Sequence, residues 1–333
     1  MSALLRIVQL GLGPIGRESA RLVARRAGLR LVGAVDNDPA LEGRDVAELT
    51  GSPEAAGLKV ESDLEEALSR LKPDVVLQTT GSRLSSVMDQ IESVIAAKAN
   101  LASTSEELFY PYRRHPKEAK RINAMALQHG VSVLGTGVNP GFAMDTLALC
   151  LSGVCREVRS VTIRRVVDAA TRRGPLQKKV GAGLEPDEFR RRVARRELGH
   201  VGLVESLDLL AAALGLPVEN VEETIEPVIS EVALQTEYVS VAAGQVAGIH
   251  HTAVGRGAGG NLVSLDLKMY VGAPAPFDEV VLVGDPPVSN RVEGGIAGDA
   301  ATAGILVNAA WAVCEAEPGL RTAIDMPLIR WRG

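Results

Sequence analysis

Cysteines and aromatic residues are scarce in this sequence. Only three of its 333 residues are cysteine, namely Cys150, Cys155 and Cys314, and aromatic residues make up only 3% of the chain. An odd number of cysteines without C-x-x-C spacing argues against both a disulfide framework and a zinc site. We therefore expect a protein of the reducing cytoplasm.

Long apolar runs and a surplus of basic charge are missing as well. The apolar stretch 207–216 is interrupted by Asp208 and Gly215, and it is well short of the ~20 residues that a membrane span requires. The formal net charge is −5 and the pI is about 5.7, so no basic surplus is available to neutralise a phosphate backbone. The sequence predicts a soluble protein that binds neither a membrane nor nucleic acid.

Hydrophobic residues, which form 46% of the chain, follow a regular rhythm in its first part. Between Leu4 and Gly135, short aliphatic runs alternate with stretches in which apolar residues recur every three or four positions. This alternation is typical of βαβ units and a parallel sheet. The expected strands are 6–10, 30–35, 74–78, 100–102 and 131–134, and the expected helices are 15–26, 64–71, 85–98 and 117–129.

The rhythm changes after Gly141, where long strand-like runs follow one another with fewer helices between them. The runs lie at 158–167, 224–243, 262–271 and 279–283. They indicate a second, α+β domain with a mixed, largely antiparallel sheet. The basic segment 171–183 is expected to be a loop. An alanine-rich helix at 299–316 and a short tail are expected to end the chain.

One glycine motif indicates a nucleotide site. The segment Gly11-Leu12-Gly13-Pro14-Ile15-Gly16 is a G-x-G-x-x-G between a predicted strand and a predicted helix, which lets the backbone approach a pyrophosphate at a helix N-terminus. Asp36 ends the second strand 20 residues after Gly16. A carboxylate there accepts hydrogen bonds from the ribose hydroxyls and repels a 2′-phosphate. Since Asn37 and Asp38 supply no cation, the motif predicts a Rossmann domain that prefers NAD to NADP.

The other predicted parallel strands also end in small or polar residues. Ligands of open parallel sheets bind outside the carboxyl ends of the strands, so these residues are candidate cofactor contacts. We expect Asn139 to contact the substrate as well. The candidates are Thr79, Thr80 and Gly81, then Ser103 and Thr104, and then Asn139 in the glycine-rich stretch 135–141.

Two adjacent carboxylates follow the fourth strand. Glu106 or Glu107 is a candidate general acid and base if partial burial brings its pKa toward neutrality. The alternative is a helix-capping role, because Thr104 with Glu107 and Ser103 with Glu106 both match the S/T-x-x-E capping box. Spacing alone leaves open which glutamate has which role.

The five histidines have different expected roles. His115 and His129 lie in or beside a predicted surface helix and are expected to be solvated. His200 precedes an apolar helix, where packing or capping competes with a role in the site. His250 and His251 are neighbours in a strand, so their side chains point to opposite faces and cannot hold one metal together. We expect no metal site.

Lys178 is a further candidate substrate contact. It lies in the basic segment 172–179, which is either a solvated turn or a site for a substrate carboxylate. Together with Asn139 and His200, it completes the set of expected substrate residues.

Several blocks of the sequence resemble those of 2,4-diaminopentanoate dehydrogenase and the related native amine dehydrogenases, a family often described as dihydrodipicolinate reductase-like. The resemblance implies a Rossmann domain at 1–140, an α+β substrate and dimerisation domain at 141–298, and a C-terminal helix at 299–333 that returns to the Rossmann domain. The blocks are 11–16, 103–108, 135–142, 199–203, 298–303 and 318–320.

The resemblance also implies an activity and a set of partners. The family interconverts a small amine with a ketone and ammonia, using NAD or NADP, and its members are commonly homodimers. It places the catalytic glutamate at Glu106 and leaves Glu107 as the cap. This sequence departs from the family at Ala309-Ala310-Trp311 in the final helix and at the pair His250 and His251, and we expect both departures to reshape the substrate pocket.

Two alternatives stand beside the amine dehydrogenase. A dihydrodipicolinate reductase is disfavoured because His250-His251-Thr252-Ala253-Val254 lacks the lysine of a His-His-x-x-Lys motif. The other alternative is a dinucleotide-binding redox sensor without catalytic activity. A sensor would bind NADH and turn over no ketone with ammonia.

Overall fold

The structure is a computed structural model that describes residues 4–332 of the chain. These residues form two compact units. The first unit comprises the chain up to Gly141 together with the chain from Ala297 onward, and the second comprises the residues from Phe142 to Ile296.

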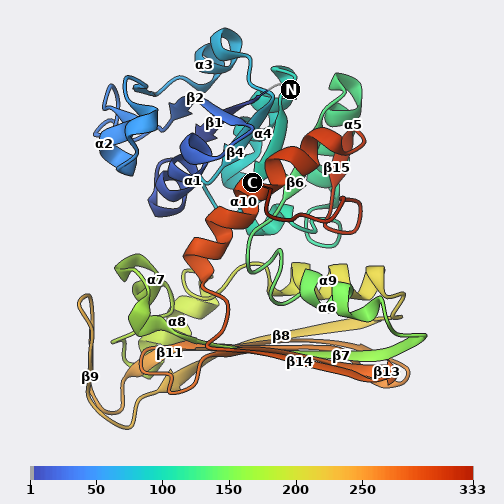
Figure 1. The fold of residues 1–333 in the computed structure, drawn as a ribbon. Helices are drawn as coiled ribbons and strands as arrows, with labels where there is room; N and C mark the ends of the chain where they lie inside the picture. The colour runs from blue at the N-terminus through green and yellow to red at the C-terminus, as the bar shows by residue number, and fades with distance from the viewer. Residues whose placement is uncertain (1–3, 333) are drawn as a thin grey trace. The chain divides into compact units, whose positions relative to one another are not determined.

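The aliphatic runs of the first unit form a seven-stranded sheet in the order β15-β6-β5-β4-β1-β2-β3 (Figure 1). Every neighbouring pair in this sheet is parallel, which confirms the expected fold class. The strands are β1 (Leu5–Leu10), β2 (Leu29–Val35), β3 (Val60–Glu61), β4 (Val75–Gln78), β5 (Asn100–Ser103), β6 (Ser132–Gly135) and β15 (Gly319–Arg321).

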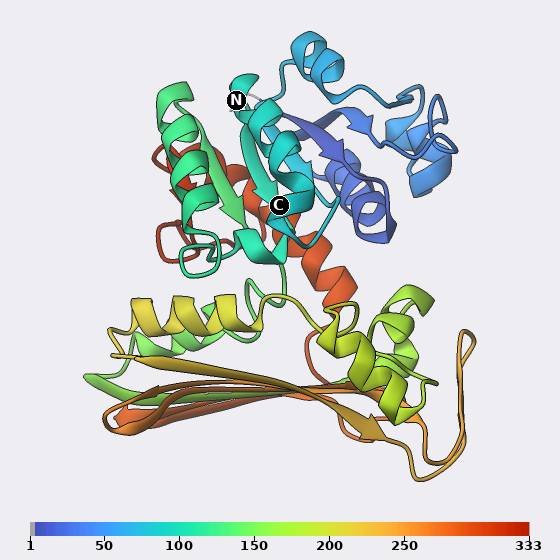
Figure 2. The same cartoon turned by 180° about the vertical axis from the view of Figure 1, so that it is seen from behind.

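Helices cover both faces of this sheet, because successive strand residues point to opposite sides. Ile7 belongs to a core cluster with residues of α1 and α10, whereas Val8 belongs to a second cluster with residues of α3, α4 and α5. The two layers can be followed from opposite sides in Figures 1 and 2. The helices are α1 (Pro14–Arg25), α2 (Val46–Thr50), α3 (Leu64–Leu71), α4 (Leu84–Ala96), α5 (Pro116–His129) and α10 (Gly298–Glu315).

Three short elements of this unit were not predicted. The strands β3 and β15 have two and three residues, and the helix α2 has five. Such short segments contain too few residues to show a hydrophobic period. The prediction of a short tail after the last helix is therefore wrong in part, because residues 319–321 form the strand β15, which pairs with β6.

The second unit contains a six-stranded sheet in the order β14-β13-β7-β12-β11-β8. β7 and β12 are parallel and the other pairs are antiparallel, which confirms the mixed, largely antiparallel sheet. Residues 224–243 are not one strand, because the end of β8 and the separate pair β9 (Leu234–Gln235) and β10 (Ser240–Val241) divide them. The long strands are β7 (Glu157–Asp168), β8 (Asn220–Ile229), β11 (Val246–Gly257), β12 (Gly260–Tyr270), β13 (Phe277–Asp285) and β14 (Val288–Glu293).

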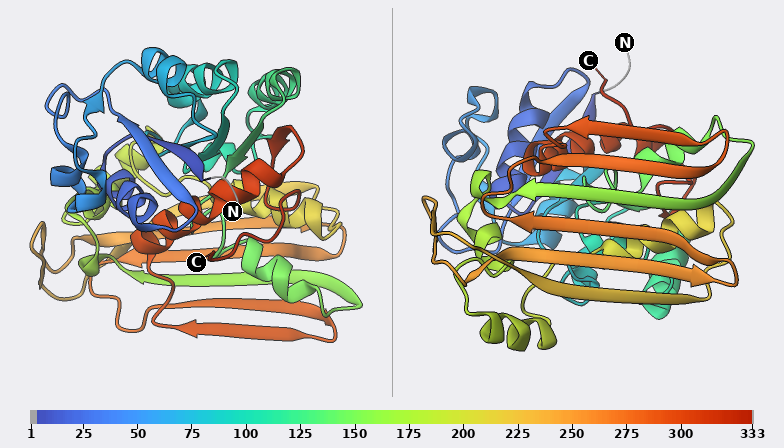
Figure 3. Two further views of the ribbon diagram at one scale, coloured as in Figure 1. Left: turned by 45° about the horizontal axis from the view of Figure 1, so that its top comes forward. Right: turned by 90° about the horizontal axis from the view of Figure 1, so that it is seen from below.

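Helices of the second unit lie on one face of this sheet (Figure 3). Along β12, Val263, Leu265, Leu267 and Met269 are buried and alternate with half-exposed residues, as expected for a sheet with one covered face. The expectation of fewer helices between the strands is confirmed, since four α-helices accompany the strands β7 to β14. The helices are α6 (Thr146–Ser152), α7 (Gly174–Lys179), α8 (Pro186–Ala194) and α9 (Leu203–Ala213).

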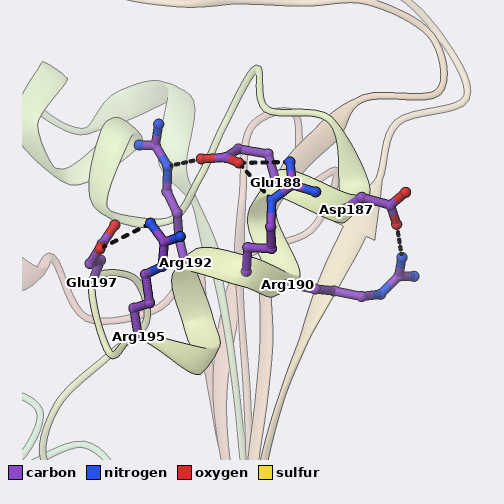
Figure 4. Close-up of polar contacts among 7 residues, drawn as sticks. Asp187, Glu188, Arg190, Arg192, Arg195 and Glu197 are labelled. Atoms are coloured by element: carbon purple, nitrogen blue, oxygen red, sulfur yellow. Dashed lines mark hydrogen bonds and ion pairs between the residues drawn. The ribbon is translucent and has the colours of Figure 1, made fainter.

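The charged surface of α8 explains why it has little helical hydrophobic pattern. Asp187 pairs with Arg190 at 3.0 Å, and Glu188 contacts Arg191 at 2.8 Å and Arg192 at 2.7 Å (Figure 4). Such exposed pairs contribute little to the stability of a helix, because solvent screens them. Its single buried residue, Phe189, attaches the helix to the unit.

The longest helix, α10, has 18 residues. Its buried side chains include Leu306, Val307 and Val313, which share a core cluster with Ile7 of β1. Within residues 4–332, no helix combines the length and the apolar character needed to cross a membrane.

Candidate functional site

The glycine loop between β1 and α1 has no room for a side chain at Gly11 and Gly16, but it has room for one at Gly13. Gly11 has a φ of +88°, and a Cβ at Gly16 would lie 1.9 Å from the carbonyl oxygen of Gly11. Any side chain at these two positions would therefore strain the loop or push the helix away from it. A Cβ at Gly13, in contrast, would have no atom of the described residues within 4 Å.

This open position lies where a diphosphate would have to approach. Gly13 is the N-cap of α1, Pro14 is the first residue of the helix, and the first turn contains no acidic residue. The amino end of α1 therefore presents its positive dipole end and its free N–H groups without a competing carboxylate in that turn. The loop fits a dinucleotide diphosphate, because Gly13 leaves space that a Cβ would occupy.

Asp36 lies at the carboxyl end of β2 and reaches the glycine loop. Its carboxylate accepts hydrogen bonds from the backbone N–H groups of Leu12, at 2.5 Å, and of Asp38, at 2.9 Å. Asn37 beside it is exposed. Arg17 donates through Nε to the carbonyl oxygen of Leu12 at 2.8 Å. The loop therefore contacts a guanidinium that the glycine motif does not include.

The loop after β4 is joined to the glycine loop by side chains. Thr79 donates through its hydroxyl to the carbonyl oxygen of Gly11 at 3.0 Å. Gln9, which is fully buried, donates to the same oxygen at 3.0 Å and to the Thr79 hydroxyl at 3.1 Å. Thr80 donates to Gln90 of α4, and Gly81 follows it. A buried glutamine within an apolar strand is the signal that could have identified Gln9.

The segment after β5 carries the two candidate glutamates on a 3-10 turn, η2 (Glu106–Leu108). Glu106 is half-buried and Glu107 is buried. The expected capping boxes are wrong, because Ser105 is the N-cap of η2 and no side chain caps this turn. The Ser103 hydroxyl instead accepts the N–H of Ser105 at 3.1 Å.

Glu107 caps a different helix. Its Oε2 accepts the N–H of Leu84, the first residue of α4, at 2.9 Å and lies 3.1 Å from Nε2 of His115. The expectation that His115 is solvated is therefore wrong, since its side chain is only 25% exposed and contacts this carboxylate. Nothing in the local sequence links residues 84, 107 and 115, so the spacing rules could not find this contact. Thr104 contacts the carbonyl oxygen of Gln78 at 3.4 Å.

Asn139 lies beyond β6 in the glycine-rich segment. Both polar atoms of its amide are buried and have no hydrogen-bond partner among the described residues. Leaving a buried polar group unpaired costs about 1–3 kcal/mol, so such an amide is expected to serve a ligand. Within the first unit, the site candidates thus all lie at the carboxyl ends of the parallel strands.

In the second unit, His200 lies just before α9. Burial and, to a lesser extent, the nearby His251, Lys179 and Arg165 lower its pKa well below its usual value. The imidazole is therefore neutral at pH 7, and its Nε2 has no hydrogen-bond partner among the residues described. Helix packing alone, the alternative role, leaves this nitrogen unexplained.

Lys178 does not lie in a loop. The segment expected to be a loop at 171–183 contains α7, and Lys178 lies exposed near the end of this helix. The sequence does contain features that favour this six-residue helix. Pro175 lies near its start, and two lysines lie in its last turn. The structure gives Lys178 no contact that distinguishes it as a substrate residue.

A polar row on the helix-covered face of the six-stranded sheet was not predicted. Asp278, Arg165, Leu267 and His251 are register neighbours on successive strands. Arg165 forms a buried ion pair with Asp278 and donates to the carbonyl oxygen of Ile296 at 2.8 Å. His251 is fully buried and contacts Glu223 at 3.0 Å. These residues could have been identified in the sequence as charged or polar side chains at positions where the alternating pattern of the strand expects an apolar residue.

The two departures from the family lie in different units of the chain. Trp311 lies 3.4 Å from the Cβ position of Gly28, which precedes β2 and therefore belongs to the amino ends of the strands. It cannot reshape a site at their carboxyl ends. His250 points to the face opposite His251, where it contacts Asp266 at 2.9 Å. The predicted opposite orientation of the two histidines is confirmed.

The loop geometry predicts that one alanine substitution affects NADH binding and another affects the stability of the fold. Gly13→Ala should leave the melting temperature nearly unchanged and weaken NADH binding by roughly tenfold, about 1.4 kcal/mol, because the methyl group would enter the open space. Gly16→Ala should destabilise the fold by about 1–3 kcal/mol through the clash with Gly11. Thermal unfolding and NADH titration of both variants would test this. Equal loss of stability in the two variants would contradict the proposed open position.

The fold and the loop geometry place the chain in the class of dinucleotide-binding proteins with a Rossmann unit and a second, sheet-containing unit. The family model of the 2,4-diaminopentanoate dehydrogenase C-terminal domain matches residues 142–331, and that of the dihydrodipicolinate reductase N-terminus matches residues 5–104. The chain belongs to the 2,4-diaminopentanoate dehydrogenase family, which confirms the resemblance noted in the sequence.

Individual relatives agree with this assignment. The chain is 30% identical over 338 residues to the 2,4-diaminopentanoate dehydrogenase of Acetoanaerobium sticklandii, covering 98% of this chain and 94% of the relative. It is 25% identical to an amine dehydrogenase of Streptomyces virginiae, covering 96% and 95%. The solved amine dehydrogenase of Mycobacterium smegmatis has the same fold, with a TM-score of 0.87, 23% identity and coverage of 99% and 98%. These matches do not favour the reductase or the redox sensor.

Proposed function

We propose that this protein is an NAD(P)-dependent amine dehydrogenase that interconverts a small amine with the ketone and ammonia. A diamino acid such as 2,4-diaminopentanoate is the proposed substrate. The observation that carries the proposal is the 30% identity to a 2,4-diaminopentanoate dehydrogenase over 98% of this chain. Because the similarity includes the second unit, it extends beyond the nucleotide-binding fold that many other activities share.

The first unit supplies the proposed cofactor residues. Gly13 and the amino end of α1 would hold the diphosphate, and Asp36 would accept the ribose hydroxyls. The nicotinamide, when bound, supplies hydride chemistry. The remaining proposed contacts lie after the carboxyl ends of strands or in the first turn of α1, and they are Gly11, Leu12, Pro14, Ile15, Gly16, Asn37, Thr79, Thr80, Gly81, Ser103, Thr104 and Asn139.

Glu106 is the proposed acid and base. Ammonia adds to the ketone to give a carbinolamine, which loses water to give the iminium that accepts hydride. Each step moves a proton that hydride transfer does not supply. A half-buried carboxylate that follows β5 can take a proton from the attacking ammonia while solvent protonates the carbonyl oxygen, and can then give its proton to the hydroxyl, which leaves as water. Glu107 is less suited to this role, since its carboxylate already serves Leu84 and His115.

The proposed substrate contacts are Asn139, His200 and Lys178. Among the residues that the structure describes, the Asn139 amide has no hydrogen-bond partner and offers both a donor and an acceptor, and Nε2 of His200 likewise has none. Lys178 is exposed and would bring a positive charge toward a substrate carboxylate. The support for Asn139 and His200 is stronger, because their unpaired atoms are buried.

We further propose that the enzyme prefers NAD, is a homodimer and works in the cytoplasm. The NAD preference is supported by Asp36, and the homodimer by the common assembly of the family that the chain belongs to. The three cysteines are free in the structure, which is compatible with a reducing compartment.

A panel of ketones and amines tests the function. Purified protein should oxidise NADH in the presence of a ketone only when ammonia is added, and should reduce NAD with the matching amine. The panel should pair diamino acids with monoamines of equal length. NADH binding without turnover of any member would support the redox sensor instead. Turnover of cyclic imines alone would support the reductase.

Cofactor preference gives a second expected result. Asp36→Ser with Asn37→Arg should move the preference toward NADP, because it removes a charge that repels the 2′-phosphate and adds a guanidinium that binds it. The ratio of kcat/KM for the two cofactors should change by at least about tenfold. A wild type that clearly prefers NADP would contradict the role given to Asp36.

Arg17 supplies the control for this experiment. Its contact with the Leu12 carbonyl places a positive charge at the loop in the wild type. If residual NADP use depends on this charge, Arg17→Gln should reduce NADP use more than NAD use. The same loss with both cofactors would mean that Arg17 only supports the loop.

A further inference from the structure

The buried carboxylate of Glu107 lies where three elements meet. It comes from η2, the turn that also carries Glu106, and its Oε2 accepts the Leu84 N–H at the start of α4. The same oxygen lies 3.1 Å from Nε2 of His115, the N-cap residue of α5. A carboxylate only accepts hydrogen bonds, so a hydrogen bond across this distance requires the hydrogen on Nε2 of His115.

The Glu107 carboxylate lies at the amino ends of two long helices. α4 and α5 contain 13 and 14 residues, and the carboxylate contacts the first residue of one and the N-cap of the other. No side chain of Arg83 or His115 caps its own helix. A negative charge near a helix amino end is stabilising, and this carboxylate accepts a backbone N–H at the start of α4 and contacts the side chain of the N-cap residue of α5.

The backbone around Glu107 is held as firmly as its side chain. The Glu107 N–H donates to the Ser82 carbonyl oxygen at 3.1 Å, and the Ser105 hydroxyl donates to the same oxygen at 3.2 Å. On the other side, a Cβ at Gly135 would lie 2.5 Å from the backbone nitrogen of Phe109. The turn is therefore fixed between the loop before α4 and the end of β6.

Fixing Glu107 also fixes its neighbour. A 3-10 turn has three residues per turn, so adjacent side chains point about 120° apart. When Glu107 points into the protein toward Leu84 and His115, Glu106 must point in another direction. Without the Glu107 side-chain contacts, only the backbone bonds and the packing at Gly135 would hold the turn, and the Glu106 carboxylate would lose part of its fixed orientation.

We propose that Glu107 and His115 are positioning residues that hold Glu106 in its reactive orientation. This inference rests on the proposed function, in which Glu106 is the acid and base. It assigns to Glu107 more than a capping role. A cap alone would affect stability, whereas a positioning residue must affect kcat in a properly folded enzyme.

A comparison of Glu107 with Asp63, a second carboxylate that caps a helix, separates a capping role from a positioning role. Asp63 caps α3 by accepting the Glu66 N–H at 2.9 Å, and α3 follows β3, four strands from β5 in the sheet. Glu107→Ala and Asp63→Ala should each lower the melting temperature. Only Glu107→Ala should lower kcat, by about 10- to 100-fold, while the KM for the ketone and the Kd for NADH stay within about twofold.

Conservative variants sharpen the test. Glu107→Gln keeps an acceptor for the Leu84 N–H and should recover part of kcat. His115→Gln can still donate through its amide, whereas His115→Phe cannot, so only the phenylalanine variant should lose kcat. The double variant of Glu107→Ala with His115→Phe should be no slower than Glu107→Ala alone, because both act on one contact.

The possible failures are distinguishable. If the wild type turns over amines and Glu107→Ala keeps the kcat of Asp63→Ala, Glu107 is only a cap and the inference is overturned. If the loss appears in KM or in NADH binding rather than in kcat, the inference is overturned as well. If the wild type binds NADH and turns over no amine or ketone, the proposed function fails, and the inference fails with it.

Discussion

Glu106→Gln should reduce turnover by roughly two to four orders of magnitude, the usual contribution of a general acid and base. Glutamine keeps the shape of the side chain and cannot exchange a proton with the carbinolamine. Because the residue lies on a turn that is fixed by its neighbours, the fold and NADH binding should stay unchanged. Ammonia-dependent ketone reduction, NADH titration and thermal unfolding of the purified variant would measure all three quantities.

The matched control is Glu107→Gln, which removes the charge of the adjacent carboxylate. It should lose less activity than Glu106→Gln, because its role acts through Glu106. An active Glu106→Gln together with an inactive Glu107→Gln would exchange the two roles. If both variants kept wild-type turnover, the acid and base would lie elsewhere, and His200 would be the next residue to test.

Truncation after Gly298 should abolish folding of the first unit. The truncation removes nearly all of α10 and the whole of β15, which belong to that unit. Leu306, Val307 and Val313 are completely buried. Burial of a Val or Leu side chain is worth about 1.5–3 kcal/mol, so these three alone contribute about 5–9 kcal/mol. That is comparable with the whole stability of a typical domain, about 5–15 kcal/mol.

A shorter truncation after Thr322 supplies the control. It keeps α10 and the pairing of β15 with β6, and it removes a tail whose Met326 and Ile329 are partly buried against the core. This variant should remain folded with a lower melting temperature and should bind NADH. Soluble yield, circular dichroism and NADH titration would compare the two chains. A folded, active chain that ends at Gly298 would refute the structural role of α10.

The parallel sheet and its glycine loop were predictable because their signals are local. A strand that is buried on both faces is a short aliphatic run, and a crossover helix repeats its apolar residues every three or four positions. The carboxyl ends of parallel strands share one edge of a sheet, so the order of strands and helices along the chain was enough to place Asp36, Thr79 and Asn139 together. The short strands β3 and β15 gave no such signal.

The capping partners were not predictable for the opposite reason. The expected capping box joined Glu107 to Thr104, three residues away, whereas its actual partners are Leu84 and His115. Which N–H group a carboxylate reaches depends on how the helices pack, and packing brings together residues that are far apart in sequence. The row of Arg165, His251 and Asp278 likewise depends on strand register across the sheet.

The sequence by itself determined the fold class, the glycine loop and the family, because each depends on residue types at short, fixed spacing. Only the tertiary structure decided that Gly13 borders open space while Gly16 does not, and that Asn139 and His200 have buried atoms without a partner among the described residues. These properties depend on which atoms surround a group in space. A one-dimensional pattern fixes the period of a segment, but not the neighbours that packing gives to each of its side chains.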